Sequence, residues 1–185
     1  MTTRMIELES QEAAAETMRP ASAAHVRAAA ALRLVAFAAA LAAAMVVVTN
    51  RQDRWGVRVS FKMFDVWEHH IGSSCRAFVA INFVCAAYSV LTALFVKRLI
   101  SQFWLHHADQ FMVNLQTAAT AGAGAVGSVA MWGNKPSGWF AVCRLYRLYC
   151  DKGAVSLALA FVAFTALGVA SALSRIPRAP PPAST

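Results

Sequence analysis

Residues 29–49 read AAALRLVAFAAALAAAMVVVT, and this stretch decides the fold class. It is apolar on every side of a helix, and Arg33 is its single charged residue. A helix rises 1.5 Å per residue, so about 20 apolar residues cross the ~30 Å hydrocarbon core of a bilayer. The stretch therefore predicts a membrane-spanning helix. It does not alternate apolar and polar residues as the strands of a membrane barrel do, which excludes a β-barrel.

Three more stretches meet the same length requirement, at residues 77–96, 109–132 and 154–173. Among all four stretches only Arg33 and Asp109 are charged. Helices satisfy their own backbone hydrogen bonds in lipid, so the predicted fold class is all-α, a four-transmembrane-helix bundle. The predicted membrane domain covers residues 29–173.

Polar tails flank this domain, at residues 1–28 and 174–185, and the second tail is rich in proline. The first apolar run follows a polar, Glu-containing segment and is long enough to stay in the membrane. We therefore expect an uncleaved signal anchor. A proline-rich terminus is expected to stay extended and unpacked.

The composition agrees with a membrane protein and argues against nucleic-acid binding. Hydrophobic residues make up 58% of the chain and charged residues 14%, against roughly 45–50% and 25% in soluble domains. The net charge is +8, but the 17 Lys and Arg residues are scattered through every polar segment and form no basic block. The bilayer is thus the predicted partner, and nucleic acid is not.

An even number of spans places both tails on one side of the membrane. The Lys and Arg residues divide almost equally between the two sides, so the positive-inside rule does not choose an orientation. Cys75, Cys143 and Cys150 all fall on the side opposite the tails, where a disulfide could persist if that side is oxidising. We therefore predict that both termini are cytosolic.

Arg33 and Asp109 could form a pair inside the membrane. The first and third spans run in the same direction, so these two residues lie at similar depth on the same side. An ionised side chain in hydrocarbon costs about 2.5–3.5 kcal/mol on insertion scales, and pairing lowers that cost. The alternative is that Arg33 extends to the headgroups while Asp109 caps the third helix, and the residues alone do not decide between the two.

The third span carries a stripe of small and polar residues that predicts close helix packing. Small residues four apart let helix backbones approach each other, at the centre of the bundle or at a subunit contact. A polar path through the membrane would use the same stripe, but such paths usually contain several deep ionisable groups. The predicted packing residues are Gln116, Thr120, Ala123, Gly124 and Gly127.

Cys143 and Cys150 are separated by six residues within one short loop and could close a small disulfide ring there. Free thiols are the alternative, because the sequence does not show whether the two Cα atoms lie within disulfide reach. The four cysteines and the two adjacent His pairs have no metal-site spacing. No cofactor, phosphate-loop or nucleophile motif occurs either, so we predict no metal, no cofactor and no enzymatic activity.

The sequence resembles the Casparian strip membrane domain protein family of plants, in its CASP-like branch. The resemblance lies in the four-span layout, in the segment around Arg33, in AYSVLTALF, in ADQFMVNLQTAATA with Asp109, and in GWFAVCRLYRLYC with its two cysteines. It covers the chain from about Ala31 to Leu173.

An Arg in the first span and an Asp in the third are characteristic of that family, so this resemblance favours a structural charge pair between Arg33 and Asp109. It also implies cytosolic tails, a distant likeness to MARVEL proteins and an oligomerising plasma-membrane scaffold. True Casparian members restrict diffusion and recruit lignin-polymerising enzymes. The first outer loop, NRQDRWGVRVSFKMFDVWEHHIGSSC, lacks the short hydrophobic motif of the root-barrier proteins. A Casparian strip role is therefore not carried over.

Two functions follow for testing. The first is a non-enzymatic scaffold that forms homo-oligomers, or hetero-oligomers with related four-span proteins, and organises partners such as cell-wall-modifying enzymes. The second is a small channel or transporter subunit with a polar path along the third span from Asp109 through Gln116 and Thr120. The scaffold predicts slow lateral diffusion, and the channel predicts flux that falls when Asp109 is neutralised.

Overall fold

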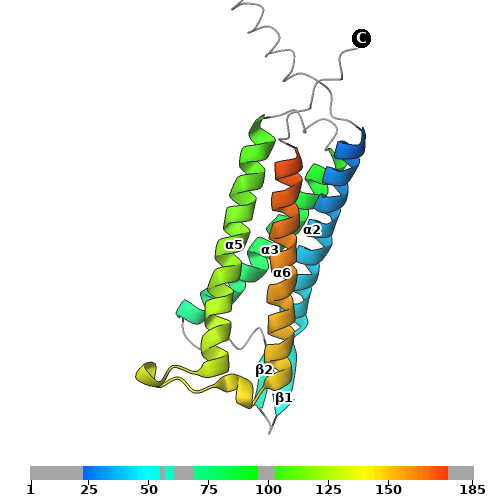
Figure 1. Cartoon of the computed structure of the whole chain (residues 1–185). Coiled ribbons are helices and arrows are strands. Elements are labelled where there is room, and N and C mark those ends of the chain that lie inside the picture. The colour runs from blue at the N-terminus through cyan, green and yellow to red at the C-terminus, as the bar shows by residue number, and fades with distance from the viewer. Residues whose placement is uncertain (1–22, 55–56, 61–68, 96–102, 175–185) are drawn as a thin grey trace, which may run out of the picture.

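The computed structural model describes residues 23–54, 57–60, 69–95 and 103–174. Four long helices stand side by side in one bundle (Figure 1). The predicted all-α four-helix membrane fold is therefore confirmed. The helices are α2 Ala23–Thr49, α3 His69–Leu94, α5 Phe103–Trp132 and α6 Arg147–Leu173.

Three of these four helices are apolar and long enough to cross a membrane by themselves, namely α2, α3 and α6. The fourth, α5, is 30 residues long but carries more small and polar residues. It stands beside the other three in the same bundle (Figure 1). Each helix begins about two turns before the N-terminal limit of its predicted span, so helix and span do not coincide.

The buried side of every helix follows one spacing, alternately three and four residues. This spacing is typical of helices that pack nearly parallel with side chains interlocking along a seam. In α2 and α6 the buried positions are mostly alanine, whereas in α3 and α5 several are polar. They are Ala29, Arg33, Ala36, Ala40 and Ala43 in α2, Phe78, Asn82, Cys85, Ser89 and Thr92 in α3, Leu105, Asp109, Met112 and Gln116 in α5, and Ser156, Ala160, Ala163, Leu167 and Ala170 in α6.

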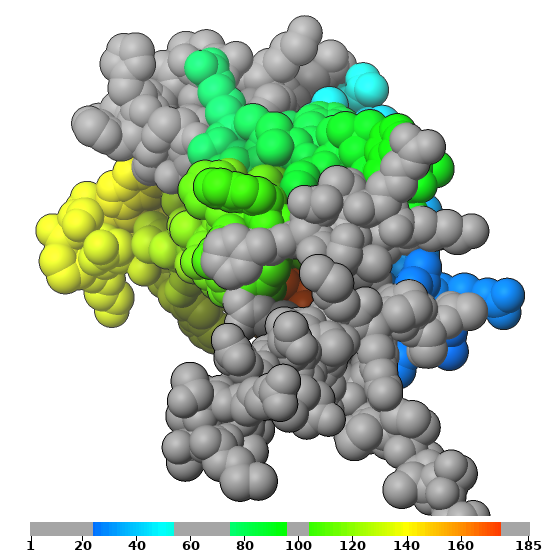
Figure 2. All heavy atoms as spheres, turned by 90° about the horizontal axis from the view of Figure 1, so that it is seen from above, coloured from blue at the N-terminus to red at the C-terminus, as the bar shows by residue number. Residues whose placement is uncertain are grey.

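A small hairpin lies at one end of the bundle and was not predicted. Its strands are β1 Arg51–Arg54 and β2 Val57–Ser60, antiparallel, with Arg51 opposite Ser60. The loop after α5 lies at the same end and contains two short 3-10 helices, η2 Lys135–Ser137 and η3 Val142–Arg144. This loop, yellow in both views, projects sideways from the bundle (Figure 1, Figure 2).

Gly133 ends α5 and turns the chain into this loop. Its φ of +73° lies in the left-handed region, and an added Cβ would stand 2.8 Å from the carbonyl oxygen of Trp139. Only glycine fits such a position without strain. The turn then brings Asn134 and Trp139 together in an isolated antiparallel bridge.

The two ends of the bundle differ. The first described residue of α2 and the last of α6 lie at one end, and the hairpin and disulfide loop lie at the other (Figure 1). Most of the predicted tails, and the part of the inner loop at residues 97–102, fall outside the described residues. From Phe103 onward the predicted inner loop is already helical, because α5 begins there.

Candidate functional site

An ion pair between α2 and α5 lies in the buried interior of the bundle. Arg33 Nη1 donates to Asp109 Oδ1 at 2.8 Å, and Arg33 Nη2 donates to Asp109 Oδ2 at 2.5 Å. The two side chains are 0% and 1% exposed. This is the two-pronged arrangement in which a guanidinium and a carboxylate bind most strongly and with most directional specificity.

Helix α3 completes the cluster with two hydroxyl groups. Tyr88 Oη donates to Asp109 Oδ1 at 2.6 Å, and Arg33 Nη1 donates to Thr92 Oγ1 at 2.9 Å. The Thr92 hydroxyl in turn donates to the backbone oxygen of Tyr88 at 2.8 Å. Burying two charges is expensive unless their remaining hydrogen-bonding groups find partners, and these hydroxyls supply them.

A second buried polar contact joins α3 to α5 about two turns along the bundle. Gln116 Nε2 donates to Asn82 Oδ1 at 2.7 Å, and Asn82 Nδ2 donates to the backbone oxygen of Phe78. Three buried atoms in this region have no hydrogen-bond partner among the described residues: Arg33 Nε, Ser89 Oγ and Gln116 Oε1. The buried polar side chains therefore come from three helices, and not all of their hydrogen-bonding atoms have partners among the described residues.

The structure brings Arg33 and Asp109 together, in the geometry of the pair and not of a snorkelling arginine beside a helix cap. Gln116 pairs across to α3, whereas Thr120 donates to the backbone oxygen of Gln116 in its own helix at 2.7 Å. The predicted packing residues Ala123, Gly124 and Gly127 border a cavity instead of touching a neighbouring backbone.

Sequence reasoning missed three members of the polar core, Asn82, Tyr88 and Thr92. A usable signal was present, because Asn82, Ser89 and Thr92 are polar residues at helical spacing on one face of an otherwise apolar span. Polar groups in a span almost always face the bundle interior. That rule would have turned this face of α3 toward the charge pair.

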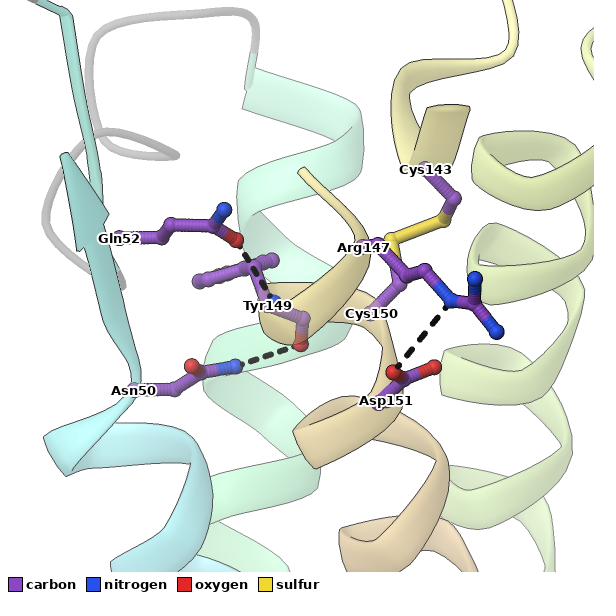
Figure 3. Close-up of a disulfide and its surroundings, with 7 residues drawn as sticks. All are labelled: Asn50, Gln52, Cys143, Arg147, Tyr149, Cys150 and Asp151. Carbon is purple, nitrogen blue, oxygen red and sulfur yellow. Dashed lines mark hydrogen bonds and ion pairs between the residues drawn. A yellow bond between two sulfur atoms is a disulfide. The ribbon is translucent and has the colours of Figure 1, made fainter. Parts of the chain in front are cut away.

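The loop after α5 is closed by a disulfide between Cys143 and Cys150, whose Cα atoms are 5.7 Å apart. The start of α6 is also tied to the hairpin side of the molecule (Figure 3). Tyr149 N donates to Gln52 Oε1 at 2.9 Å, and Asn50 Nδ2 donates to the oxygen of Tyr149 at 2.8 Å. The disulfide and the hydrogen bonds of Asn50 and Gln52 to Tyr149 thus hold the hairpin end of the bundle together.

The described residues of these sites form hydrogen bonds and an ion pair that join neighbouring helices. Among the described residues no group of three or more His, Cys, Asp or Glu side chains could hold a metal ion. His106 Nδ1 lies 2.9 Å from Ser171 Oγ, and its ring meets that of His107 edge to face. The side chains of His69 and His70 lie outside the described residues. The buried cluster can fix the rotation and depth of three helices.

Comparison with known proteins extends these observations. The model of the Casparian strip membrane protein domain matches residues 22–166. A CASP-like protein UU-1 of Sorghum bicolor is 76% identical over 137 residues, which cover 74% of this chain and 71% of the relative.

More distant relatives cover comparable or larger parts of the chain. A CASP-like protein UU1 of Oryza sativa subsp. indica is 54% identical over 177 residues, 96% of this chain and 99% of the relative. A CASP-like protein 1C1 of Arabidopsis thaliana is 32% identical over 133 residues, 71% and 78% of the two chains. No solved structure matches the chain. The chain belongs to the Casparian strip membrane protein family, in its CASP-like branch.

Proposed function

We propose that this protein is a non-enzymatic scaffold of the plasma membrane, with both termini in the cytosol, that self-associates and organises partner proteins. Related four-span proteins can enter the same assembly, and cell-wall-modifying enzymes are the partners we expect it to organise. The observation that carries this proposal is the outward face of α5.

Helix α5 exposes its polar and small residues where the other helices expose apolar ones. The outward face of α5 includes Gln110, Asn114, Thr117, Ala118, Ala121 and Ala125, all exposed, beside one large apolar side chain, Phe111. Asn114 lies five residues past the N-terminal limit of the predicted span at Asp109, about 7.5 Å into the hydrocarbon. Among the described residues, its side chain accepts a long hydrogen bond of 3.4 Å from neighbouring Gln110. Amide groups and small residues on a lipid-facing surface are the pattern that favours a second helix.

The channel alternative gains little support from the geometry. Asp109 and Gln116, which would line its polar path, are each 0% exposed and held by partners from neighbouring helices. The cavity described below is bordered by other residues. Within the described residues, a polar path along α5 would be closed at the charge pair.

The test compares the wild type with Asn114→Leu and Ala121→Leu, tagged and expressed at native level in plasma membrane. Lateral mobility is measured by single-molecule tracking and size by crosslinking. We expect slow oligomers for the wild type and faster, smaller species for both variants, because leucine removes the amide or blocks close approach.

Ala158→Leu is the matched control, since Ala158 is an exposed alanine on α6. It should behave as the wild type. Freely diffusing monomers of the wild type would overturn the scaffold, and equal effects of Ala158→Leu and Ala121→Leu would remove α5 as the contact.

A further inference from the structure

A cavity of about 360 Å³ lies at the disulfide end of the bundle. All four long helices border it, through residues that include Val47, Phe78, Gly124 and Leu157. Its volume falls in the range of small-molecule sites, which are mostly apolar with a few placed polar groups. None of the residues that form the charge pair and its hydroxyl partners borders this cavity.

The small residues of α5 keep this space open. A Cβ added at Gly124 would meet no atom within 4 Å, and one added at Gly127 would meet only Leu157 Cδ1, at 3.9 Å. These glycines are therefore not needed for close approach of a neighbouring helix within the chain. Together with Ala123 they form the part of the α5 wall that carries the smallest side chains.

One buried polar group on the cavity wall has an unused acceptor. Asn50 is 4% exposed, and its Nδ2 is fixed by the hydrogen bond to the backbone oxygen of Tyr149 at 2.8 Å. Its Oδ1 has no partner among the described residues. A buried acceptor without a donor costs free energy, which a ligand with a donor group would recover.

The cavity has an orientation relative to the membrane. Its α5 wall runs from Ala123 to Trp132, nine helical steps or about 13.5 Å, close to the depth of one leaflet. Asn50 follows directly after the end of α2 and so lies at the membrane surface end. Trp132 at the same end is 79% exposed, as expected for an interfacial tryptophan.

We infer that this cavity binds a membrane sterol, whose hydroxyl donates to Asn50 Oδ1 at the surface while its ring body lies against Ala123 and Gly127. A sterol has one donor at one end and a rigid apolar body, which matches one buried acceptor at the surface end of a mostly apolar cavity. A rigid body also loses less conformational entropy on binding than a flexible chain does.

Other lipids fit the same features less well. The ester and phosphate oxygens of phosphatidylcholine are acceptors and cannot satisfy Asn50 Oδ1. Ceramides and phospholipids with hydroxyl or ammonium headgroups carry donors, but their two flexible chains must be ordered in the cavity. Ceramide represents these two-chain donors in the experiment, which has to separate them from a sterol.

The test uses the full-length protein in phosphatidylcholine nanodiscs with a photoactivatable sterol. Mass spectrometry should locate the adducts on the cavity wall, and unlabelled sterol should displace the probe while ceramide and added phosphatidylcholine do not. A sterol methyl ether, which lacks the donor, should compete about fivefold less well than the free sterol.

A Cβ added at Gly124 meets no atom within 4 Å, so we expect the side chain of Gly124→Leu to enter the cavity and to reduce labelling at least fivefold. Gly122→Leu is the matched control, because its added Cβ also meets nothing within 4 Å but Gly122 does not border the cavity. Both variants must keep the Cys143–Cys150 disulfide and a single size in detergent. Equal labelling of both variants, adducts spread over the lipid-facing surface, or equal displacement by ceramide would overturn the sterol site.

Discussion

The charge pair between Arg33 and Asp109 contributes to the bundle mainly through what its loss would leave behind. A buried bidentate ion pair contributes little net free energy of folding compared with an apolar pair of the same shape. Removing one partner is different, because the other charge then stays in a low-dielectric interior without compensation. A single substitution should therefore lower the free energy of unfolding by more than the intact pair contributes to it.

Asp109→Asn is expected to lower the free energy of unfolding by about 3 kcal/mol, since Arg33 keeps its charge and loses its counter-charge. The double substitution Arg33→Asp with Asp109→Arg should recover part of this loss. Unfolding of the disulfide-intact protein in mixed detergent measures both effects. If the swap is as unstable as the sum of its two single variants, the pair is not what holds α2 to α5.

Tyr88→Phe removes one hydrogen bond to Asp109 and keeps the ring. We expect a loss of about 1–2 kcal/mol, because the carboxylate is charged and buried. In the Asp109→Asn background the same change should cost clearly less, since the two residues act in one network. Equal costs in both backgrounds, measured by the same unfolding assay, would mean that the tyrosine contributes by packing alone.

The sequence revealed this site in part. The similar depth of Arg33 and Asp109 follows from span order, so a possible pair was predictable. The polar face of Asn82, Ser89 and Thr92 also indicated the rotation of α3, but the individual contacts of Tyr88 and Thr92 with the pair depend on side-chain packing, which the sequence does not show. In lipid the apolar outside of a helix resembles its apolar inside, so hydrophobic pattern alone fixes that rotation poorly.

At the level of elements, α5 differs from the other three helices in the residues that it buries and exposes. It contributes the buried carboxylate of the charge pair, Asp109, on one face and presents amides and small residues on the opposite face. The residues predicted for packing lie in two different environments. Gln116 is buried in the bundle, whereas Ala123, Gly124 and Gly127 lie beside the cavity. A subunit contact through α5 stays a prediction.

The disulfide loop is the element whose removal can be tested most directly. Cys143→Ser with Cys150→Ser should lower the free energy of unfolding by about 2.5 kcal/mol, the loop-closure entropy of so small a ring. Cleavage by trypsin at Arg144 should become faster, while the helix content stays unchanged, because the charge pair lies nearer the other end. Cys75→Ser, which removes a free thiol, is the control. Loss of the helix content of the whole bundle in the double variant would contradict the expectation that the disulfide acts locally on this loop.

The β1 and β2 hairpin shows where prediction from sequence stopped. Residues 51–54 are all polar, with no apolar alternation that would indicate a strand. What holds this end is the contact of Asn50 and Gln52 with Tyr149, almost a hundred positions further along the chain. Contacts of that sequence separation leave no local pattern.

At the level of the whole molecule, the two ends carry different groups. The disulfide end exposes Trp132, Phe140 and Leu148 beside Lys135 and Arg147, a mixture suited to the headgroup region. The opposite end receives the first and last described helical residues (Figure 1). The molecule is therefore asymmetric along the membrane normal.

The predicted orientation can be measured with glycosylation acceptors. An acceptor inserted beside Ser137 should be glycosylated during synthesis, because the disulfide end is predicted to face away from the cytosol. An acceptor added after Thr185 should stay unmodified. The reverse pattern, read as a mass shift removed by glycosidase, would show that the tails face the outside.

The two residues of the charge pair enter the membrane at different times during synthesis, and this order has a consequence. Arg33 enters the membrane with the first helix, and Asp109 arrives 76 positions later, with the third long helix. Until then the guanidinium must remain near the headgroups or hold water around it. The first helix therefore reaches its final depth only after α5 has entered. A chain that ends after α3 keeps an uncompensated arginine, a mark by which the cell can recognise an unfinished membrane protein.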